Sequence, residues 1–226
     1  MTKQEYKLYI DDVIRRVEFA RVRFDEKHIV KIVAVSKYSC ADEIKALYKI
    51  GQRAFGENKV QDLKTKSVLL EDLPLEWHFV GNLQKNKINN LLDLNPALFH
   101  ALDSLDLARE LQKKLQAKDM TLDALLQVNS AKEESKHGVM PEDAIKIYKE
   151  IQKECPNIRL KGVMSIGAHT DDKDLVRKSF ETTYEIYKQL EGATICSMGM
   201  SQDFELAIEC GSNMVRLGSI MFDKKH

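Results

Sequence analysis

Residues 31–58 read KIVAVSKYSCADEIKALYKIGQRAFGEN and contain one complete strand–helix–strand unit. The apolar run at 31–36 is typical of a buried strand, 41–50 is predicted to form a helix, and 54–57 forms a second strand. The first strand leads directly into Lys37. Burying an ammonium group costs several kcal/mol unless the group is paired or loses its charge. A lysine at the end of a core strand therefore needs an explanation.

The same alternation of strand and helix continues to the end of the sequence. Eight strand candidates lie at residues 31–36, 54–57, 77–80, 98–102, 122–128, 160–166, 194–198 and 214–217. Helical stretches separate them at residues 41–50, 59–70, 86–94, 105–117, 141–154, 173–190 and 203–210. Eight short strands, each but the last followed by a helix, predict an α/β protein with a closed (β/α)8 TIM barrel rather than a doubly wound open sheet.

The length of the chain agrees with one barrel preceded by a helix. The chain has 226 residues, and a barrel of this kind takes about 250 residues or slightly fewer. Residues 3–24 space their apolar side chains as one face of an amphipathic helix. These side chains are Tyr6, Ile10, Val13, Val17, Ala20 and Phe24. No linker rich in Pro, Gly or Ser interrupts the rest, so we predict a single domain over 1–226, with its barrel at 30–222.

Composition argues against several classes of partner. The 35 basic and 35 acidic side chains cancel, which gives no electrostatic reason to expect nucleic acid or an anionic membrane as partner. Acids interrupt the apolar stretch at the N-terminus, and no apolar run approaches the ~18 residues of a membrane span. The four cysteines are scattered, without the spacing of a metal site. We therefore expect a soluble, cytoplasmic protein with reduced thiols and no metal.

Polar side chains gather where the predicted strands end, and in this fold that rim holds the ligand. The residues that close or follow the strands are Lys37, Glu57, Asn58, His78, Gly81, Asp103, Ser104, Asn129, Ser165, Ser197, Gly199, Arg216 and Gly218. A polar set that converges on one rim favours a ligand-binding site there over polar residues that only hydrogen-bond with one another inside the protein.

The last two strands end in small residues. After CSMG (196–199) we expect a helix to start near Ser201, and RLGS (216–219) closes the last strand. Small residues let N–H groups approach a ligand, helix N-termini favour anions, and these two loops are the usual phosphate site of the fold. Two such loops side by side predict phosphate binding. The alternative is that Ser201 caps its helix and that the glycines serve turns.

Lys37 fits a phosphate-binding rim as a nucleophile. An amine in a dry wall has a lowered pKa and attacks carbonyl groups. Pyridoxal 5′-phosphate suits both the amine and the phosphate-binding rim, because its aldehyde forms an imine with lysine and its phosphate needs backbone donors. The alternative from spacing is a structural salt bridge between Lys37 and Glu57.

Six stretches of the sequence together resemble the pyridoxal phosphate homeostasis proteins, relatives of the N-terminal barrel of alanine racemase. The stretches are VAVSKY, AFGENKVQ, WHFVGNLQKNK, ESKHGVMPED, KGVMSIG and CSMGMSQDFELAIECGSNMVRLGSIMF. They occur in the order of the family and cover the chain from about residue 30 to residue 222. The resemblance implies an alanine racemase N-terminal domain-like barrel with pyridoxal phosphate as its cofactor.

The resemblance also implies roles for individual residues. Lys37 would carry the cofactor as a Schiff base, and Arg216 would face the pyridine nitrogen. The segments SMGMS and RLGS would bind the phosphate through Ser197, Ser201, Gly218 and Ser219. Asn58 and His78 would line the pocket beside the ring, although His78 also fits a core histidine that satisfies a backbone carbonyl.

The sequence departs from the family pattern at a few positions. Lys59 replaces a common tyrosine, Asn82 a common histidine and Asn213 a usual threonine, and the end reads MFDKK. The lysine, the arginine and the phosphate glycines are all retained. The departures therefore affect details of the rim.

The resemblance predicts a protein that holds pyridoxal phosphate on Lys37 for intracellular homeostasis of the cofactor, with little or no catalysis. A permanently protonated arginine at the ring nitrogen makes the ring a weaker electron sink, and no second base is evident. Its partners would be the cofactor and, transiently, apo-enzymes that use it, and we expect a monomer. The alternatives are a slow amino-acid racemase, a cofactor-free Schiff-base aldolase, or an interaction module that docks through residues 3–24.

Overall fold

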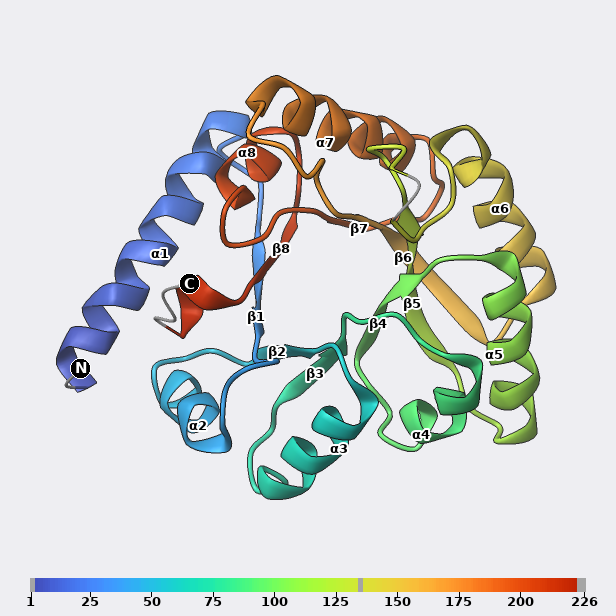
Figure 1. Cartoon of the computed structure of the whole chain (residues 1–226), viewed down its shortest axis with the longest axis horizontal. Coiled ribbons are helices and arrows are strands. Elements are labelled where there is room, and N and C mark those ends of the chain that lie inside the picture. Colours follow the sequence, from blue (N-terminus) through green and yellow to red (C-terminus); the bar gives the residue numbers. More distant parts are fainter. Residues whose placement is uncertain (1–2, 134–135, 223–226) are drawn as a thin grey trace.

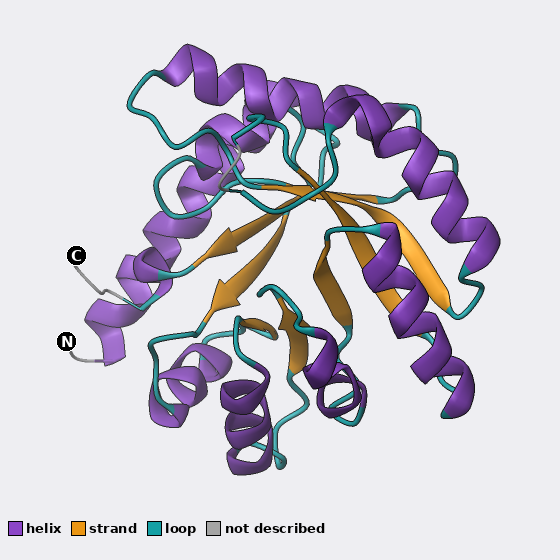
Figure 2. Cartoon of the chain, turned by 45° about the vertical axis from the view of Figure 1, so that its right-hand side comes forward, coloured by secondary structure: helices purple, strands orange, loops and turns teal. Residues whose placement is uncertain are grey.

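The computed structural model describes residues 3–133 and 136–222. Its eight parallel strands pair in sequence order, and β1 (Lys31–Val35) pairs with β8 (Met214–Leu217) to close the barrel. The helices lie around the outside of the strands (Figures 1 and 2). The predicted (β/α)8 barrel is confirmed.

Each predicted strand and helix has a counterpart in the structure. The remaining strands are β2 (Ala54–Glu57), β3 (Glu76–Phe79), β4 (Leu98–Leu102), β5 (Leu122–Val128), β6 (Ile158–Ser165) and β7 (Ile195–Ser197). The helices are α1 (Lys3–Phe24), α2 (Ala41–Lys49), α3 (Val60–Leu69), α4 (Ile88–Leu92), α5 (Leu105–Ala117), α6 (Pro141–Glu154), α7 (Lys173–Lys188) and α8 (Phe204–Glu209), with 3-10 turns η1 (Lys85–Lys87) and η2 (Ser219–Met221).

Local sequence explains where several helices begin. The side chain of Ser104 accepts a hydrogen bond from the N–H of Leu107 and caps α5. Asp172 caps α7 in the same way through the N–H groups of Asp174 and Leu175. Pro141 occupies the first turn of α6, where its missing N–H has no partner to lose.

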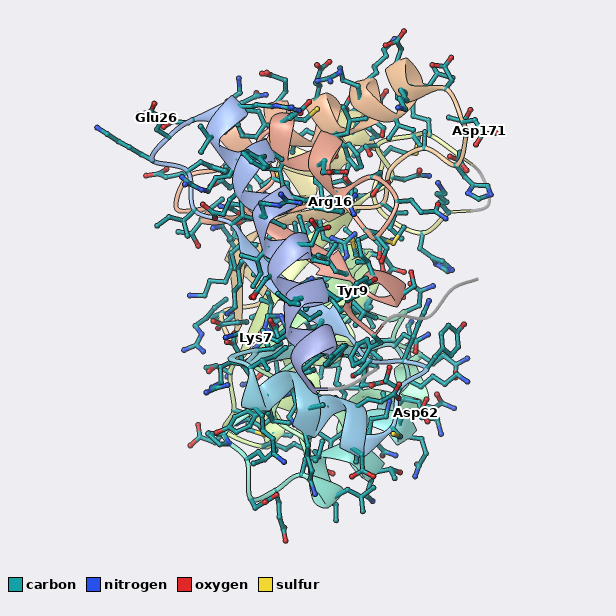
Figure 3. All side chains as sticks on the ribbon, turned by 90° about the vertical axis from the view of Figure 1, so that its left-hand side faces the viewer. Lys7, Tyr9, Arg16, Glu26, Asp62 and Asp171 are labelled. Atoms are coloured by element: carbon teal, nitrogen blue, oxygen red, sulfur yellow. The ribbon has the colours of Figure 1, made fainter. Side chains whose placement is uncertain are left out.

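Helix α1 covers the outside of the barrel next to α8 (Figure 1). Its predicted apolar face is buried at Ile10, Val13, Val17 and Ala20. Arg16 lies on the same side of the molecule as α8 (Figure 3), and its guanidinium makes two 2.9 Å hydrogen bonds to the Glu205 carboxylate. The predicted amphipathic helix is therefore an integral layer of the fold.

The close approach of β6 to β7 depends on a glycine in the middle of β6. Gly162 has a φ of +145°, and β6 shifts its register against β5 at this point. A Cβ on Gly162 would lie 1.9 Å from the carbonyl oxygen of Ile195 on β7. The approach of the two backbones therefore requires glycine here.

Among the described residues, no helix combines the length and the apolar character needed to cross a membrane.

Candidate functional site at the carboxyl ends of the strands

A cavity of about 700 Å³ opens where the strands end. Six of the predicted site residues line it: Lys37, Asn58, Ser201, Arg216, Gly218 and Ser219. They come from the ends of β1, β2 and β8 and from the loop after β7. The structure therefore brings together residues that are far apart in the sequence, on the rim where this fold binds ligands.

Lys37 faces this cavity as an exposed side chain. Strand β1 ends at Val35, and the N–H of Ser39 donates a 2.8 Å hydrogen bond to the carbonyl of Ser36, so Lys37 projects from a turn. Within the described part of the chain, no hydrogen bond or ion pair engages its Nζ, which lies 5.0 Å from the Tyr38 ring centroid. The expected dry wall around Lys37 is wrong, because the chain has left the sheet at this point.

Arg216 lies in the floor of the cavity and is only 5% exposed. Its Nη1 donates to the carbonyl and the hydroxyl of Ser197, at 2.9 and 2.7 Å, and its Nη2 donates to the carbonyl of Ser165 at 2.8 Å. These acceptors are all neutral. Burial lowers the pKa of Arg216 to about 10, although the charge of Asp203 opposes that change. The guanidinium remains a hydrogen-bond donor at neutral pH.

Ser197 does not line the cavity, and its contribution goes through Arg216. It is fully buried at the end of β7, where both its oxygen atoms accept from Nη1. A contact with a ligand was predicted for it. The structure instead places it behind the guanidinium as a support.

The loops after β7 and β8 are joined by Ser201. Its hydroxyl accepts a 3.1 Å hydrogen bond from the N–H of Gly218. The predicted helical stretch 203–210 corresponds to α8, which begins at Phe204. Ser201 therefore lies ahead of the helix rather than at its start, in a turn that Asp203 Oδ1 closes by accepting a hydrogen bond from the N–H of Met200. Ser201 is therefore a bridge between the two loops and does not cap α8.

Asn58 lines the cavity as predicted, but His78 does not. His78 is 1% exposed inside the barrel, with Nδ1 2.8 Å from Nε2 of His100 and Nε2 3.0 Å from Oε1 of Glu76. Because a carboxylate only accepts, His78 Nε2 carries the proton of that bond, and its Nδ1 accepts from His100. The structure favours the alternative of a core histidine, with side chains rather than a backbone carbonyl as its partners.

Acid is expected to destabilise the fold through this histidine pair. Burial lowers the pKa of His78 from 6.5, and the pKa of His100 lies well below 6.5 for the same reason and because positive charge is nearby. Below about pH 6.5 the two histidines bind protons in the unfolded chain but stay neutral in the folded barrel. The free energy of unfolding should therefore fall from about pH 7 to about pH 5. Urea unfolding at both pH values measures the change. A His100→Leu variant with an equal pH dependence would contradict this origin.

Glu57 and Lys66 form a largely buried ion pair that the sequence analysis did not identify. Glu57 Oε1 lies 2.6 Å from Lys66 Nζ, so the alternative of a Lys37–Glu57 salt bridge is wrong. Glu57 is fully buried and does not line the cavity. A signal for Lys66 was present, since α3 buries Val60 and Leu63 and the next inward turn falls on residues 66–67.

Asp203 lines the cavity but was not among the predicted site residues. It lines the wall beside Ser201, and burial raises the pKa of its carboxyl group. Across the described ranges, no group of three or more His, Cys, Asp or Glu side chains could hold a metal ion.

Comparison with known proteins identifies the family. The family model described as alanine racemase, N-terminal domain, matches residues 11–225. The pyridoxal phosphate homeostasis protein of Helicobacter pylori is 56% identical, over 96% of this chain and 98% of its own length. The chain belongs to the pyridoxal phosphate homeostasis protein family.

Solved structures agree with this assignment. A protein of unknown function from Bifidobacterium adolescentis superposes with a TM-score of 0.89 at 29% identity, covering 97% of this chain and 95% of its own. PipY of Synechococcus elongatus, solved with pyridoxal phosphate bound, gives a TM-score of 0.78 at 29% identity, covering 92% and 99% of the two chains.

Two departures from the family pattern lie on the cavity wall. Lys59 and Asn82 both line it, whereas Asn213 lies beneath β7 and binds the backbone of Thr194 and Cys196. The prediction that departures affect rim details therefore applies to the first two. Residues 134–135 of the ESKHGVMPED stretch and the terminal 223–226 lie outside the described residues.

Proposed function

We propose that this chain binds pyridoxal 5′-phosphate, holds it as a Schiff base on Lys37, and serves the intracellular supply of the cofactor without turning over a substrate. The observation that carries the proposal is the meeting of an unengaged lysine amine and two small-residue loops in one cavity. Pyridoxal phosphate bound to PipY and the name of the Helicobacter pylori relative support it. The proposal includes a cytoplasmic location and transient contact with apo-enzymes that receive the cofactor.

The loops after β7 and β8 fit a phosphate group. Among the described residues, no hydrogen bond uses the backbone N–H of Ser201 or of Ser219, and both residues line the cavity. The bond from Gly218 to Ser201 holds the two loops together. Free N–H groups on adjacent loops are the donors that a phosphate needs.

Lys37 and Arg216 fit the other end of the cofactor. When bound, the cofactor supplies an aldehyde that condenses with a primary amine. Lys37 presents such an amine without having to break a hydrogen bond or an ion pair to any residue that the structure describes. Arg216, held rigidly by Ser197 and Ser165, offers a donor to a ring nitrogen and does not protonate it.

This arrangement favours retention of the cofactor over turnover. A ring whose nitrogen only accepts a hydrogen bond withdraws electrons weakly, so loss of a substrate α-proton gains little. We expect the loaded protein to exchange the α-deuterium of amino acids no faster than free pyridoxal phosphate does. Proton NMR of alanine measures that exchange. Rapid exchange with loss of chirality would instead support the racemase alternative.

The experiment that tests binding is titration of the cofactor-free protein with pyridoxal phosphate, followed by borohydride reduction. We expect an absorbance band that reduction removes, together with a stable adduct that peptide mass spectrometry assigns to Lys37. Lys59, in the same cavity, is the internal control for indiscriminate amine modification. A protein that gains neither the band nor an adduct at Lys37 would end the proposal.

A Ser201→Ala variant is expected to weaken the phosphate site. Loss of the acceptor for the Gly218 N–H removes one hydrogen bond between the loops, worth about 1 kcal/mol. Affinity for inorganic phosphate, measured by calorimetry, should fall by up to about tenfold. The matched control is Ser67→Ala, which removes an exposed hydroxyl that donates a hydrogen bond to the carbonyl of Lys64 within α3. Equal phosphate affinity in both variants would show that the bridge does not matter.

A further inference from the structure

A cluster of three side chains lies behind Lys37, with Ser36 and Glu57 buried and Lys66 partly buried. Glu57 closes β2, and its Oε1 accepts a 2.6 Å hydrogen bond from the hydroxyl of Ser36. The same Oε1 forms the ion pair with Lys66, which comes from α3. Lys66 Nζ also donates a 2.7 Å hydrogen bond to the carbonyl of Ser36. Ser36 is therefore held through both its side chain and its backbone.

Stability alone does not explain this cluster. Placing an ion pair in the interior desolvates both charges, and well-packed apolar replacements of buried pairs are often neutral or stabilising. Oε2 of Glu57 is buried without a hydrogen-bond partner in the described residues, which adds to the unfavourable desolvation. Burial also raises the pKa of Glu57 despite the nearby ammonium. The position of the cluster therefore needs another reason.

The cluster acts on the residue that precedes Lys37. The N–H of Ser36 donates to the carbonyl of Gly56 at 2.9 Å, and its carbonyl accepts from both Lys66 and the N–H of Ser39. The turn 36–39 thus begins at Ser36, whose N–H, carbonyl and hydroxyl all make hydrogen bonds. Among the described residues, the Lys37 side chain has no hydrogen bond or ion pair to fix its direction, only a contact with the neighbouring Tyr38 ring.

We propose that Ser36, Glu57 and Lys66 form a positioning clamp for Lys37. The clamp fixes the turn 36–39 at the end of β1, so that the Lys37 amine points into the cavity toward an aldehyde carbon. Glu57 and Lys66 act through Ser36 and do not touch the ligand. The inference rests on the proposed function, since it assigns the clamp to attachment of the cofactor on Lys37.

The test compares Lys66→Met, the double variant Glu57→Leu/Lys66→Met, and Lys118→Met. The double variant removes the clamp without leaving a buried charge, so it should regain the melting temperature that the single variant loses. Lys118→Met breaks the surface pair with Asp93 and is the matched control for loss of a salt bridge. Each protein is assayed with pyridoxal phosphate and with pyridoxine 5′-phosphate, which has the same ring and phosphate but no aldehyde.

We expect the double variant to bind pyridoxine 5′-phosphate as the unmodified protein does, and to form the borohydride-stable adduct at Lys37 about tenfold more slowly. Lys118→Met should match the unmodified protein in both assays. A clamp that merely maintained the pocket would weaken both ligands equally, and that result would overturn the inference. An unchanged rate of adduct formation in a folded double variant would overturn it as well.

Hydrogen exchange of the cofactor-free proteins tests the positioning clamp independently of the proposed function. The N–H of Ser39, which shares the Ser36 carbonyl with Lys66, should exchange faster in the double variant than in the unmodified protein. If the unmodified protein formed no adduct, the proposed function would fail while this measurement still tested the clamp. Equal exchange of Ser39 would overturn the clamp even if the cofactor bound normally.

Discussion

Replacing Lys37 with alanine is expected to abolish the borohydride-stable attachment of pyridoxal phosphate and to leave the melting temperature unchanged. The side chain is exposed and has no hydrogen bond or ion pair in the described residues, so its removal loses only the contact with the exposed Tyr38 ring. It supplies the amine on which the proposed attachment depends, so the expected loss of adduct is complete. Intact mass after reduction and a thermal melt measure the two quantities.

Lys59→Ala is the matched control for this prediction. Lys59 is also an exposed lysine that lines the cavity, so its removal tests whether any amine there would serve. We expect the Lys59→Ala protein to keep its adduct. Attachment of the cofactor to Lys59 in the Lys37→Ala protein, at the rate seen in the unmodified chain, would contradict the special position of Lys37.

Replacing Gly162 with alanine is expected to destabilise the barrel by roughly 4 kcal/mol. The new Cβ would meet the backbone oxygen of Ile195 at 1.9 Å, and neither strand can move away without breaking its pairing. Because a domain of this kind is stable by only about 5–15 kcal/mol, much of its stability would be lost. Urea unfolding measures the change.

Gly192→Ala separates the clash from the backbone conformation. Gly192 also has a positive φ, of +75°, but an added Cβ there meets nothing within 4 Å. We expect this control to lose about 1 kcal/mol, the cost of the strained conformation alone. Equal losses in the two variants would show that the approach of β6 to β7 is not what requires glycine.

Residues close in sequence account for what was predicted well. The strands follow from short apolar runs such as KIVAV, and α1 follows from apolar residues spaced at three and four positions. Both signals can be detected within a few residues, without knowing which distant segments pack against them. The predicted stretch 203–210 likewise matches α8 to within one residue, and only the place of Ser201 was inaccurate, because Asp203 closes a turn between Ser201 and the helix.

The membership of the site was predicted from the barrel fold together with the family resemblance. Once eight parallel strands are assigned to a closed barrel, their carboxyl ends must meet on one rim, and six of the eight predicted site residues line its cavity. The two exceptions share a cause. His78 and Ser197 occupy strand positions whose side chains are buried, one against His100 and the other against Arg216.

Sequence patterns were enough to predict the number and order of the strands, the amphipathic helix ahead of them, and the lysine, arginine and small-residue loops on the rim. The pairing of Glu57 with Lys66 rather than Lys37, the exposure of Lys37 and the bridge that Ser201 makes between two loops became apparent from the packed fold. The difference comes from the range of the interactions. Periodicity is a local property of the chain, whereas the partner of a charged side chain depends on which distant segments pack against it.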